Sequence, residues 1–459
     1  MTRFIVPPQT IEEGKAINVI VYPGKIESID TTQLNKRIAK PITKYFTGLI
    51  EQEGLEYPII EKVIVKSRDL PGVDLETTIK AGEKPGTSSL QLNADHNLID
   101  GYFGYSNGLS EAAGKDQFTT YYSINSPFGY GENIYLGYTL DPKNNDAPAT
   151  TNYREAYLYG FALPLAPSNF FLFGSYNESD TEPKDLNKTG EFEQTDLGIE
   201  YQLKNTRLEK YTVSLSLQML RERERSTFSY ITDDTFFDQT ETLELKIKVL
   251  NLSFFDKWTM RAESALKTDT ARFGGRKYSN SNLSRTGATT NFMKWNGSIK
   301  MNRGLPFNLQ LRNHLNFQKL ITDKGVINAE QIGITGSGQL SGFVSGHMAG
   351  DEGYFIRSEI GRFFYPFYNN EAEIEKDDTI RIRPYLHAAY GATFFKQPAS
   401  GEYPRLEATN GGIGLKVRVP NFLIFSDYLD NNLEMATAEK IRDDSKSSTI
   451  YLINTTFSF

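Results

Sequence analysis

Tyr211-Thr212-Val213-Ser214-Leu215-Ser216-Leu217-Gln218-Met219 alternates strictly between apolar and polar side chains. Successive side chains of a β-strand point to opposite faces, so this stretch has one apolar and one polar face. The same period recurs at Leu243–Val249 and at Phe307–Phe317. Each run approaches the ~10 residues that a tilted strand needs to cross a bilayer. The alternation therefore predicts strands with lipid on one side and water on the other.

The composition agrees with that prediction. Only 39% of the 459 residues are hydrophobic, yet 13% are aromatic, with 26 Tyr and 30 Phe. A soluble enzyme of this length usually carries more aliphatic residues for its core, and no apolar run approaches the ~18–20 residues of a spanning helix. Few aliphatic and many aromatic residues are typical of membrane β-barrels. A soluble lectin-like β protein would share the alternation, but it would extract without detergent.

Several function classes are excluded by the residue inventory. The chain has no cysteine, which excludes disulfides, thiolate metal sites and cysteine nucleophiles. None of its four histidines pairs with another at a helical ligand spacing, so no HExxH-type metal site is expected. A net charge of -7 argues against a nucleic-acid partner. We therefore expect no enzyme activity, no catalytic or metal-ligating residues and no cofactor.

Residues 1–97 differ from the rest of the chain. An amphipathic helix is predicted from Thr31 to about Phe46, since Leu34, Ile38 and Ile42 recur every four residues. A second helical stretch ends at Pro71-Gly72. Two short strands follow within residues 75–93. We expect a β-α-α-β-β domain over 30–97, preceded by the remainder of another domain at 1–29.

Residues 98–459 contain about sixteen alternating segments, within the even-numbered range of outer-membrane barrels. The fifteenth is expected near residue 425. Short joints alternate with long polar ones such as Ile321–Glu352, as periplasmic turns alternate with external loops. The long, acidic joint Phe367–Thr379 breaks this rule. The alternating segment Ser448–Phe459 is expected to close the barrel, which leaves no free strand edge in lipid.

Several motifs occur in a characteristic order along nearly the whole chain. They are Phe4–Ile11, Asp69–Val73, Gly82–Leu90, Asn125–Glu132 and Gly350–Ile360. In this order they resemble two-partner secretion transporters (TpsB type) of the BamA-like superfamily. The resemblance implies a transmembrane β-barrel of about 16 antiparallel strands in the bacterial outer membrane, preceded by a small α+β POTRA domain in the periplasm. It also implies that the signal peptide and most of a first POTRA domain are missing.

The resemblance implies a function as well. Such a pore binds an unfolded TpsA-type exoprotein, usually encoded by an adjacent gene, and exports it to the cell surface. Outer-membrane lipid and the barrel-assembly machinery are the other expected partners, and a monomer is expected. The alternatives are a passive or specific porin, which lacks a β-α-α-β-β domain, and a barrel-assembly factor, which usually carries several POTRA repeats.

The resembling family has a sixth loop that folds into the pore, here about residues 320–352. Its Val-Arg-Gly-Phe tip aligns with Leu340-Ser341-Gly342-Phe343, and its Phe-x-Asp-x-Gly strand motif aligns with His387-Ala388-Ala389-Tyr390-Gly391. Serine replaces the arginine and alanine replaces the aspartate. Replacement of both the arginine and the aspartate is physically consistent, because either one alone would leave an uncompensated charge. We expect the loop to be held by glycine contacts, by Phe343 packing or by His387.

Two further groups of residues are expected at functional positions. A set of charged residues is expected to line the lumen: Asp351, Arg357, Glu359, Arg381 and Arg383. The segment Leu70-Pro71-Gly72-Val73 is expected to belong to the substrate-binding region of the POTRA domain.

Overall fold

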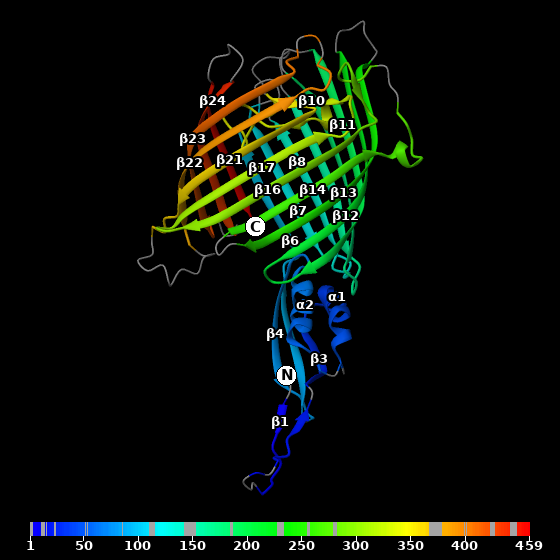
Figure 1. Ribbon diagram of the computed structural model, residues 1–459, viewed down its shortest axis with the longest axis vertical. Coiled ribbons are helices and arrows are strands. Elements are labelled where there is room, and N and C mark those ends of the chain that lie inside the picture. The colour runs from blue at the N-terminus through cyan, green and yellow to red at the C-terminus, as the bar shows by residue number, and fades with distance from the viewer. Residues whose placement is uncertain are drawn as a thin grey trace.

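A computed structural model describes residues 3–10, 14, 16–22, 24–50, 52, 54–84, 86–109, 115–141, 153–183, 187–226, 234–254, 258–278, 282–366, 379–398, 400, 402–422, 427–440 and 448–459. It consists of a β-barrel with a small α+β domain below one end (Figure 1). We call that end the domain end and the opposite end the loop end. Within the described ranges, no helix is long and apolar enough to cross a membrane.

Sixteen antiparallel strands form the closed barrel, as predicted. They are β6 Ile99–Ser106, β7 Gln117–Asn125, β8 Asn133–Asp141, β9 Tyr153–Pro164, β10 Phe170–Glu182, β11 Lys188–Asn205, β12 Lys210–Ser226, β13 Asp234–Phe254, β14 Trp258–Asp269, β16 Met293–Leu305, β17 Leu309–Leu320, β21 Glu352–Arg362, β22 Arg381–Phe394, β23 Arg405–Pro420, β24 Tyr428–Lys440 and β25 Ser448–Ser458. Each pairs with the next in chain order, and β25 pairs with β6. The last residue continues this closure, because Phe459 and Gly101 exchange backbone hydrogen bonds of 3.0 and 2.8 Å.

The predicted alternation decides which side chains face outward. On β12, Leu215 and Met219 are about half exposed, whereas Thr212 and Ser214 are buried. The apolar face therefore points away from the barrel axis and the polar face toward it. This arrangement suits a cylinder in lipid with a hydrated interior.

Two expectations about the strands were wrong. The fifteenth strand is β24, Tyr428–Lys440, and residue 425 lies outside the described residues. The apolar run at 422–425 was mistaken for a strand centre. Several strands also exceed the expected length, and β13 reaches 21 residues. Their loop-end halves are polar and pair through charges, as where Arg225 contacts Glu191 and Asp234 at 2.9 and 3.0 Å.

The α+β domain has the predicted β-α-α-β-β order. Its elements are β3 Lys25–Leu34, α1 Lys36–Phe46, the 3-10 turn η1 Thr47–Leu49, α2 Tyr57–Arg68, β4 Val73–Ala81 and β5 Thr87–His96. The sheet order is β3-β5-β4, and the helices cover one face through fully buried Ile38, Ile42 and Leu75. The first helix begins later than predicted. Residues 31–34 extend β3, and Asn35 caps α1 by accepting a 3.0 Å hydrogen bond from the Arg37 amide.

The remaining short elements lie before the domain and in the loops. β1 Arg3–Ile5 pairs with β2 Ile20–Tyr22. In the loops at the loop end, β15 Ala288–Thr289 pairs with β18 Gly325–Val326, and β19 Ile332–Gly333 pairs with β20 Ala349–Gly350. Two 3-10 turns, η3 Thr270–Phe273 and η4 Asn328–Glu330, complete the described elements of these loops.

Candidate functional site

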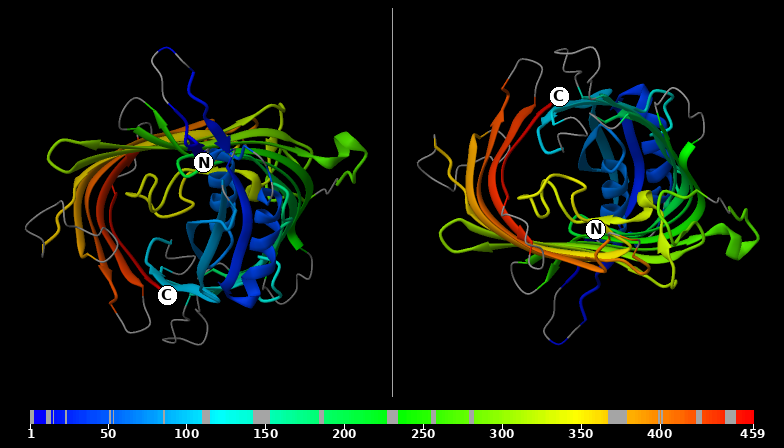
Figure 2. Two further views of the ribbon diagram at one scale, coloured as in Figure 1. Left: turned by 90° about the horizontal axis from the view of Figure 1, so that it is seen from below. Right: turned by 90° about the horizontal axis from the view of Figure 1, so that it is seen from above.

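The segment 321–351, which joins β17 to β21, lies inside the barrel (yellow in Figure 2). It carries a small apolar core of its own, including Ile334, Leu340 and Met348. This core packs on Phe355 of β21 and on alanines of the next three strands, Ala389, Ala408 and Ala438. Small inward side chains at these positions leave the space that the loop fills. We call this segment the inner loop.

The tip of the inner loop, Ser341-Gly342-Phe343, is buried against β24 and β25. Ser341 has no exposed surface and Phe343 has 6%. A Cβ atom on Gly342 would lie 2.4 Å from Ala438 Cβ and 2.7 Å from its amide nitrogen. The Ser448 hydroxyl donates a 2.6 Å hydrogen bond to the Gly342 carbonyl. Because the backbones approach so closely, only glycine fits at 342 without displacing the tip.

A buried ion pair between two wall strands holds the tip. Arg357 of β21 donates from Nη2 to Glu434 Oε2 of β24 at 3.0 Å. Its Nη1 donates to Ser341 Oγ at 2.8 Å, and the Ser341 hydroxyl in turn donates to Glu434 Oε1. Asn410 Nδ2 of β23 lies 3.4 Å from Ser341 Oγ. We call Ser341, Arg357 and Glu434 the loop lock.

Further contacts satisfy the buried charges of the loop lock. The Tyr385 hydroxyl donates to Glu434 Oε2 at 2.7 Å, and His387 Nε2 lies 3.1 Å from Oε1. Arg357 also donates to Glu359 at 3.0 and 3.1 Å. A buried ion pair is tolerated when hydrogen bonds occupy its remaining donors and acceptors. The loop lock meets that condition. Both of its charges come from the wall, because Ser341, the residue of the inner loop, is neutral.

The predicted tip and strand residues lie in one region. His387, Ala389 and Gly391 all face inward on β22, where Ala389 packs against the inner loop and His387 contacts Glu434. At Gly391, a Cβ atom would lie 3.0 Å from the Ile334 and Leu340 Cδ1 atoms of the inner loop. These three positions therefore shape the wall against which the loop rests.

Glu434, the acceptor of the loop lock, was missed by the sequence reasoning. Its strand alternates like the others, and the resembling motifs place no acidic residue there. The available signal was a carboxylate at an inward position two residues before the inward Ala436, in a strand otherwise far from Arg357 in the sequence. The lumen residue Arg357 was predicted, but its contact with the tip was not.

A second anchor fixes the first half of the inner loop. Glu330 of η4 accepts hydrogen bonds from Lys267 of β14 at 2.6 Å and pairs with Lys294 of β16 at 2.8 Å. Burial alone would raise the pKa of Glu330, but the two ammonium groups lower it to about 2. The loop is therefore tied to two separate parts of the wall, at β14–β16 through Glu330 and at β21–β24 through its tip.

Asp351 was predicted to line the lumen, and the structure places it in a buried cluster of loops at the loop end. Arg285 donates to both of its carboxylate oxygens at 2.9 and 3.0 Å. The same guanidinium binds Glu402 at 3.0 Å. Asp351 also accepts from the Val326 and Lys396 amides at 2.9 and 2.8 Å. It joins three loops instead of facing an open bore.

The other predicted lumen residues do face inward, toward the domain end of the barrel. Glu359 accepts from Arg383 Nη1 at 3.2 Å and from Lys416 at 3.3 Å, besides its contact with Arg357. Arg381 precedes Arg383 by two positions on β22 and so lies on the same face. This part of the wall is strongly basic.

The segment Leu70-Pro71-Gly72-Val73, predicted to belong to the substrate-binding region, lies at the junction of domain and barrel. Leu70 is 3% exposed, and its Cδ2 atom would lie 2.8 Å from a Cβ placed on Gly131 in the β7–β8 turn. Gly72 has φ +68, and its carbonyl accepts from the Asn97 amide at 2.8 Å. Asp69, just before the segment, binds Asn205 and Lys210 of the barrel at 2.8 and 2.7 Å. Leu70 is thus occupied by the barrel, whereas Pro71, Gly72 and Val73 are half-buried.

Comparison with curated proteins finds a transporter that is related to this chain in sequence. The chain is 24% identical over 362 residues to the hemolysin transporter protein HpmB of Proteus mirabilis, an alignment that covers 76% of this chain and 59% of that protein. The chain thus spans about three fifths of the length of this curated relative.

Solved structures show the same fold at low sequence identity. CdiB from Escherichia coli matches with a TM-score of 0.76 at 15% identity, over 100% of this chain and 80% of that one. CdiB from Acinetobacter baumannii matches with a TM-score of 0.69 at 14% identity, over 100% and 78%. BamA from Haemophilus ducreyi lacking POTRA domains 1–3 matches with a TM-score of 0.58 at 12% identity, over 100% and 90%.

The family model for the haemolysin secretion/activation protein ShlB/FhaC/HecB matches residues 86–417, well over half of the chain. That range includes β5 of the α+β domain, most of the barrel and the whole inner loop. Together with the closed barrel, this match places the chain in the bacterial outer membrane and in the ShlB/FhaC/HecB family of haemolysin secretion and activation proteins.

Proposed function

We propose that the chain is an outer-membrane pore that exports a secreted partner protein by two-partner secretion. The observation that carries this proposal is the inner loop, which is held inside a continuous barrel by contacts that can open without breaking the fold. An extended polypeptide crossing the barrel has to displace this loop. The barrel wall, closed by sixteen strands, does not need to open.

The composition of the loop lock supports such a displacement. Removing the tip breaks the hydrogen bonds of Ser341 but leaves Arg357 paired with Glu434 and Glu359. A hydrogen bond to a charged group contributes about 1.5–3 kcal/mol, whereas removing one partner of a buried ion pair costs about 3–5 kcal/mol. Releasing the tip therefore avoids the larger cost. The free energy of client folding outside the cell would supply the direction of transport.

Client recognition would use the outer edge of β4. This strand pairs with β5 on one side and is at the edge of its sheet on the other. Ile79 of β4 is 42% exposed, and Tyr57 and Ile59 of the adjacent α2 are 64% and 38% exposed. An extended segment can add to such an edge through main-chain hydrogen bonds and place apolar side chains in the neighbouring groove. This proposal places the client at the edge of β4 instead of at the segment 70–73, of which Leu70 is buried against the barrel.

Export can be tested by coexpression with the secreted protein of the neighbouring reading frame in a host with an outer membrane. We expect the partner protein in the medium only when the chain is present. Ile79→Lys should reduce export about tenfold, since a charge in the groove opposes apolar contact. Thr78→Lys is the matched control, because it lies on the same strand with its side chain on the opposite face.

Two outcomes would contradict this proposal at different levels. Equal export by the Ile79→Lys and Thr78→Lys variants would overturn the client site but not the export. An inserted barrel that conducts ions while the partner stays in the periplasm would overturn the export and favour a porin.

A further inference from the structure

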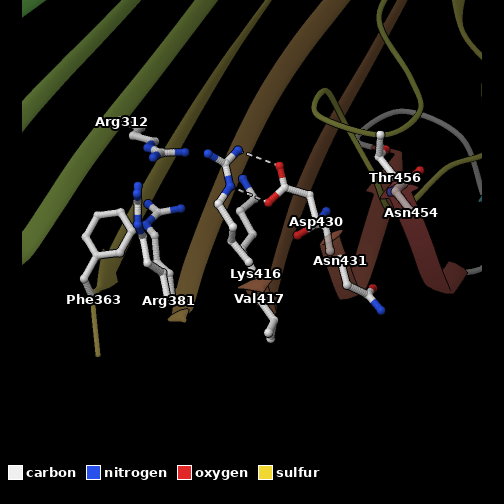
Figure 3. A pocket seen from close by; sticks show the side chains of 12 residues that line it. Arg312, Phe363, Arg381, Lys416, Val417, Asp430, Asn431, Asn454 and Thr456 are labelled. Atoms are coloured by element: carbon white, nitrogen blue, oxygen red, sulfur yellow. Dashed lines mark hydrogen bonds and ion pairs between the residues drawn. The ribbon is translucent and has the colours of Figure 1, made fainter. Parts of the chain in front are cut away.

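A cavity of about 410 Å³ opens on the inner wall at the domain end of the barrel, below the loop lock. Cationic side chains from three nearby strands dominate its lining: Arg312 of β17, Arg381 and Arg383 of β22, and Lys416 and Arg418 of β23. Figure 3 shows Arg312, Arg381 and Lys416 extending toward a common space, with Asp430 beside them. Neutral polar side chains, Asn432, Asn454 and Thr456, complete the far side. We call this site the basic cavity.

The register of β22 and β23 places like charges directly opposite each other at this site. Arg381 is directly opposite Arg418, and Arg383 is directly opposite Lys416. Like charges at opposed positions of an antiparallel pair destabilise a sheet. Two such pairs side by side are not expected in a wall whose residues serve structure alone.

The described carboxylates do not balance these cations. Asp430 binds Arg418 at 2.6 and 2.7 Å, and Glu359 binds Arg383 and Lys416 at 3.2 and 3.3 Å. With Arg381 left out of the count, the other four cations against these two carboxylates leave an excess of two positive charges among the residues that the structure describes. A partly enclosed site with one sign of charge concentrates counter-ions.

Arg383 supplies the donors that most clearly point to a ligand. The residue is 2% exposed, and its Nε and Nη2 atoms have no hydrogen-bond partner within the described part of the chain. Its guanidinium plane lies 5.3 Å from the Tyr385 ring and 5.9 Å from the Phe363 ring. Unpaired buried guanidinium donors are costly. Nε and a terminal nitrogen together form the side of the guanidinium that binds an oxyanion through two parallel hydrogen bonds.

We propose that the basic cavity binds a phosphate-type oxyanion from the aqueous phase at the domain end of the barrel. A doubly charged oxyanion offsets this excess positive charge and accepts from several guanidinium groups at once. The amides and the hydroxyl on the far side supply neutral donors. A cavity of about 410 Å³ also has room for a small organic substituent on the phosphate. This inference goes beyond export and does not depend on a protein client.

The test uses the purified full chain in a neutral detergent, with inorganic phosphate and pyrophosphate as probes in isothermal titration calorimetry. We expect one saturable site per chain, bound more tightly by pyrophosphate and weakened by added salt. Arg312→Gln and Arg381→Gln should each weaken binding about tenfold, as expected for loss of a charge-assisted contact. Arg221→Gln at the loop end is the matched control and should leave binding within about twofold.

Two comparisons distinguish the source of the phosphate group. The calorimetry is repeated in mixed micelles containing phosphatidylglycerol, whose lipid phosphate should not compete because the cavity faces the barrel interior. The calorimetry is also repeated with a variant in which the five acidic residues of the joint between β21 and β22 are replaced by the corresponding amides. These residues are Glu371, Glu373, Glu375, Asp377 and Asp378. Phosphate binding by the parent chain and by this variant supports the proposal.

Three results would overturn it. The first is the absence of saturable binding to a parent chain that shows heat-modifiable gel mobility and an intact β-sheet spectrum. The second is unchanged binding in a folded Arg312→Gln/Arg381→Gln double variant. The third is binding that arises only after the acidic joint is neutralised, since the site would then serve the chain's own carboxylates.

Discussion

Ser341 occupies the tip position where the resembling motif carries arginine, yet a guanidinium is still present at that point. It comes from Arg357 on the wall, whose Nη1 lies 2.8 Å from Ser341 Oγ. The carboxylate likewise comes from a different strand, since Glu434 is on β24 and position 389 on β22 is alanine. The ion pair has thus moved from the loop–wall contact into the wall itself.

Exchanging Ser341 of the tip with Arg357 of the wall tests whether the guanidinium of this contact has to come from the wall. Ser341→Arg places a second buried guanidinium beside Arg357, so we expect the tip to leave the wall. The double variant Ser341→Arg/Arg357→Ser should restore the contact, with a coupling energy of about 1–3 kcal/mol. The readout is limited proteolysis of the inner loop in outer-membrane preparations. Equal protection of the loop in Ser341→Arg and in the parent chain would contradict the loop lock.

The inner loop is an element held at two places, and its first anchor has a predictable pH response. The pKa of Glu330 is about 2 in the bound loop, against a usual value of about 4.3 for a free glutamate. A group whose folded pKa is lowered stabilises the fold fully above the unfolded pKa and loses that stabilisation as the pH falls through the folded one. Protection of the loop should therefore decline between about pH 4.3 and pH 2.

Glu330→Gln is the variant that checks this assignment. It leaves Lys267 and Lys294 without their carboxylate, so the loop should be less protected at neutral pH and show less change below pH 4.3. Proteolysis with an acid-stable protease measures both. A variant that declines over the same pH range as the parent would show that another group causes the response.

Packing at the wall gives a prediction for the second half of the loop. Gly391→Val adds atoms where a Cβ already lies 3.0 Å from Ile334 and Leu340. Overpacking of this kind costs about 1–3 kcal/mol, which should displace the loop and raise the ionic current through the pore. Gly304→Val is the control, because no atom lies within 4 Å of a Cβ there. Equal currents from both variants would contradict the packing of the loop on β22.

Sequence periodicity predicted the elements better than it predicted the site. The alternation at 211–219 defined both faces of β12, because only a strand with unlike surroundings keeps a period of two. The limits of β24 were missed, because the apolar run at 422–425 outweighed the polar alternation of the true strand. Glu434 could not be predicted, since its contact with Arg357 joins residues 77 positions apart across the two intervening strands β22 and β23.

On the scale of the whole molecule, the α+β domain lies below one end of a barrel whose interior holds the inner loop. The domain is fixed to the barrel by Asp69 and by the buried side chain of Leu70. Its exposed β4 edge is therefore held near the domain end of the barrel. A client bound at this edge would next meet the basic wall and then the loop lock.

The most direct test of this account is a crosslink between the loop tip and the wall. The chain contains no cysteine, so Gly342→Cys/Ala438→Cys introduces a single pair. The two Cβ positions lie 2.4 Å apart, so the tip needs to retreat by about 1.4 Å to reach the ~3.8 Å typical of a disulfide.

We predict that this pair crosslinks under mild oxidation in the outer membrane, that the crosslink stops export of the partner protein, and that a reducing agent restores it. The single-cysteine variants should export under both conditions. Failure to crosslink, or undiminished export with the tip covalently fixed to β24, would contradict the claim that the inner loop is held in the barrel and has to leave it.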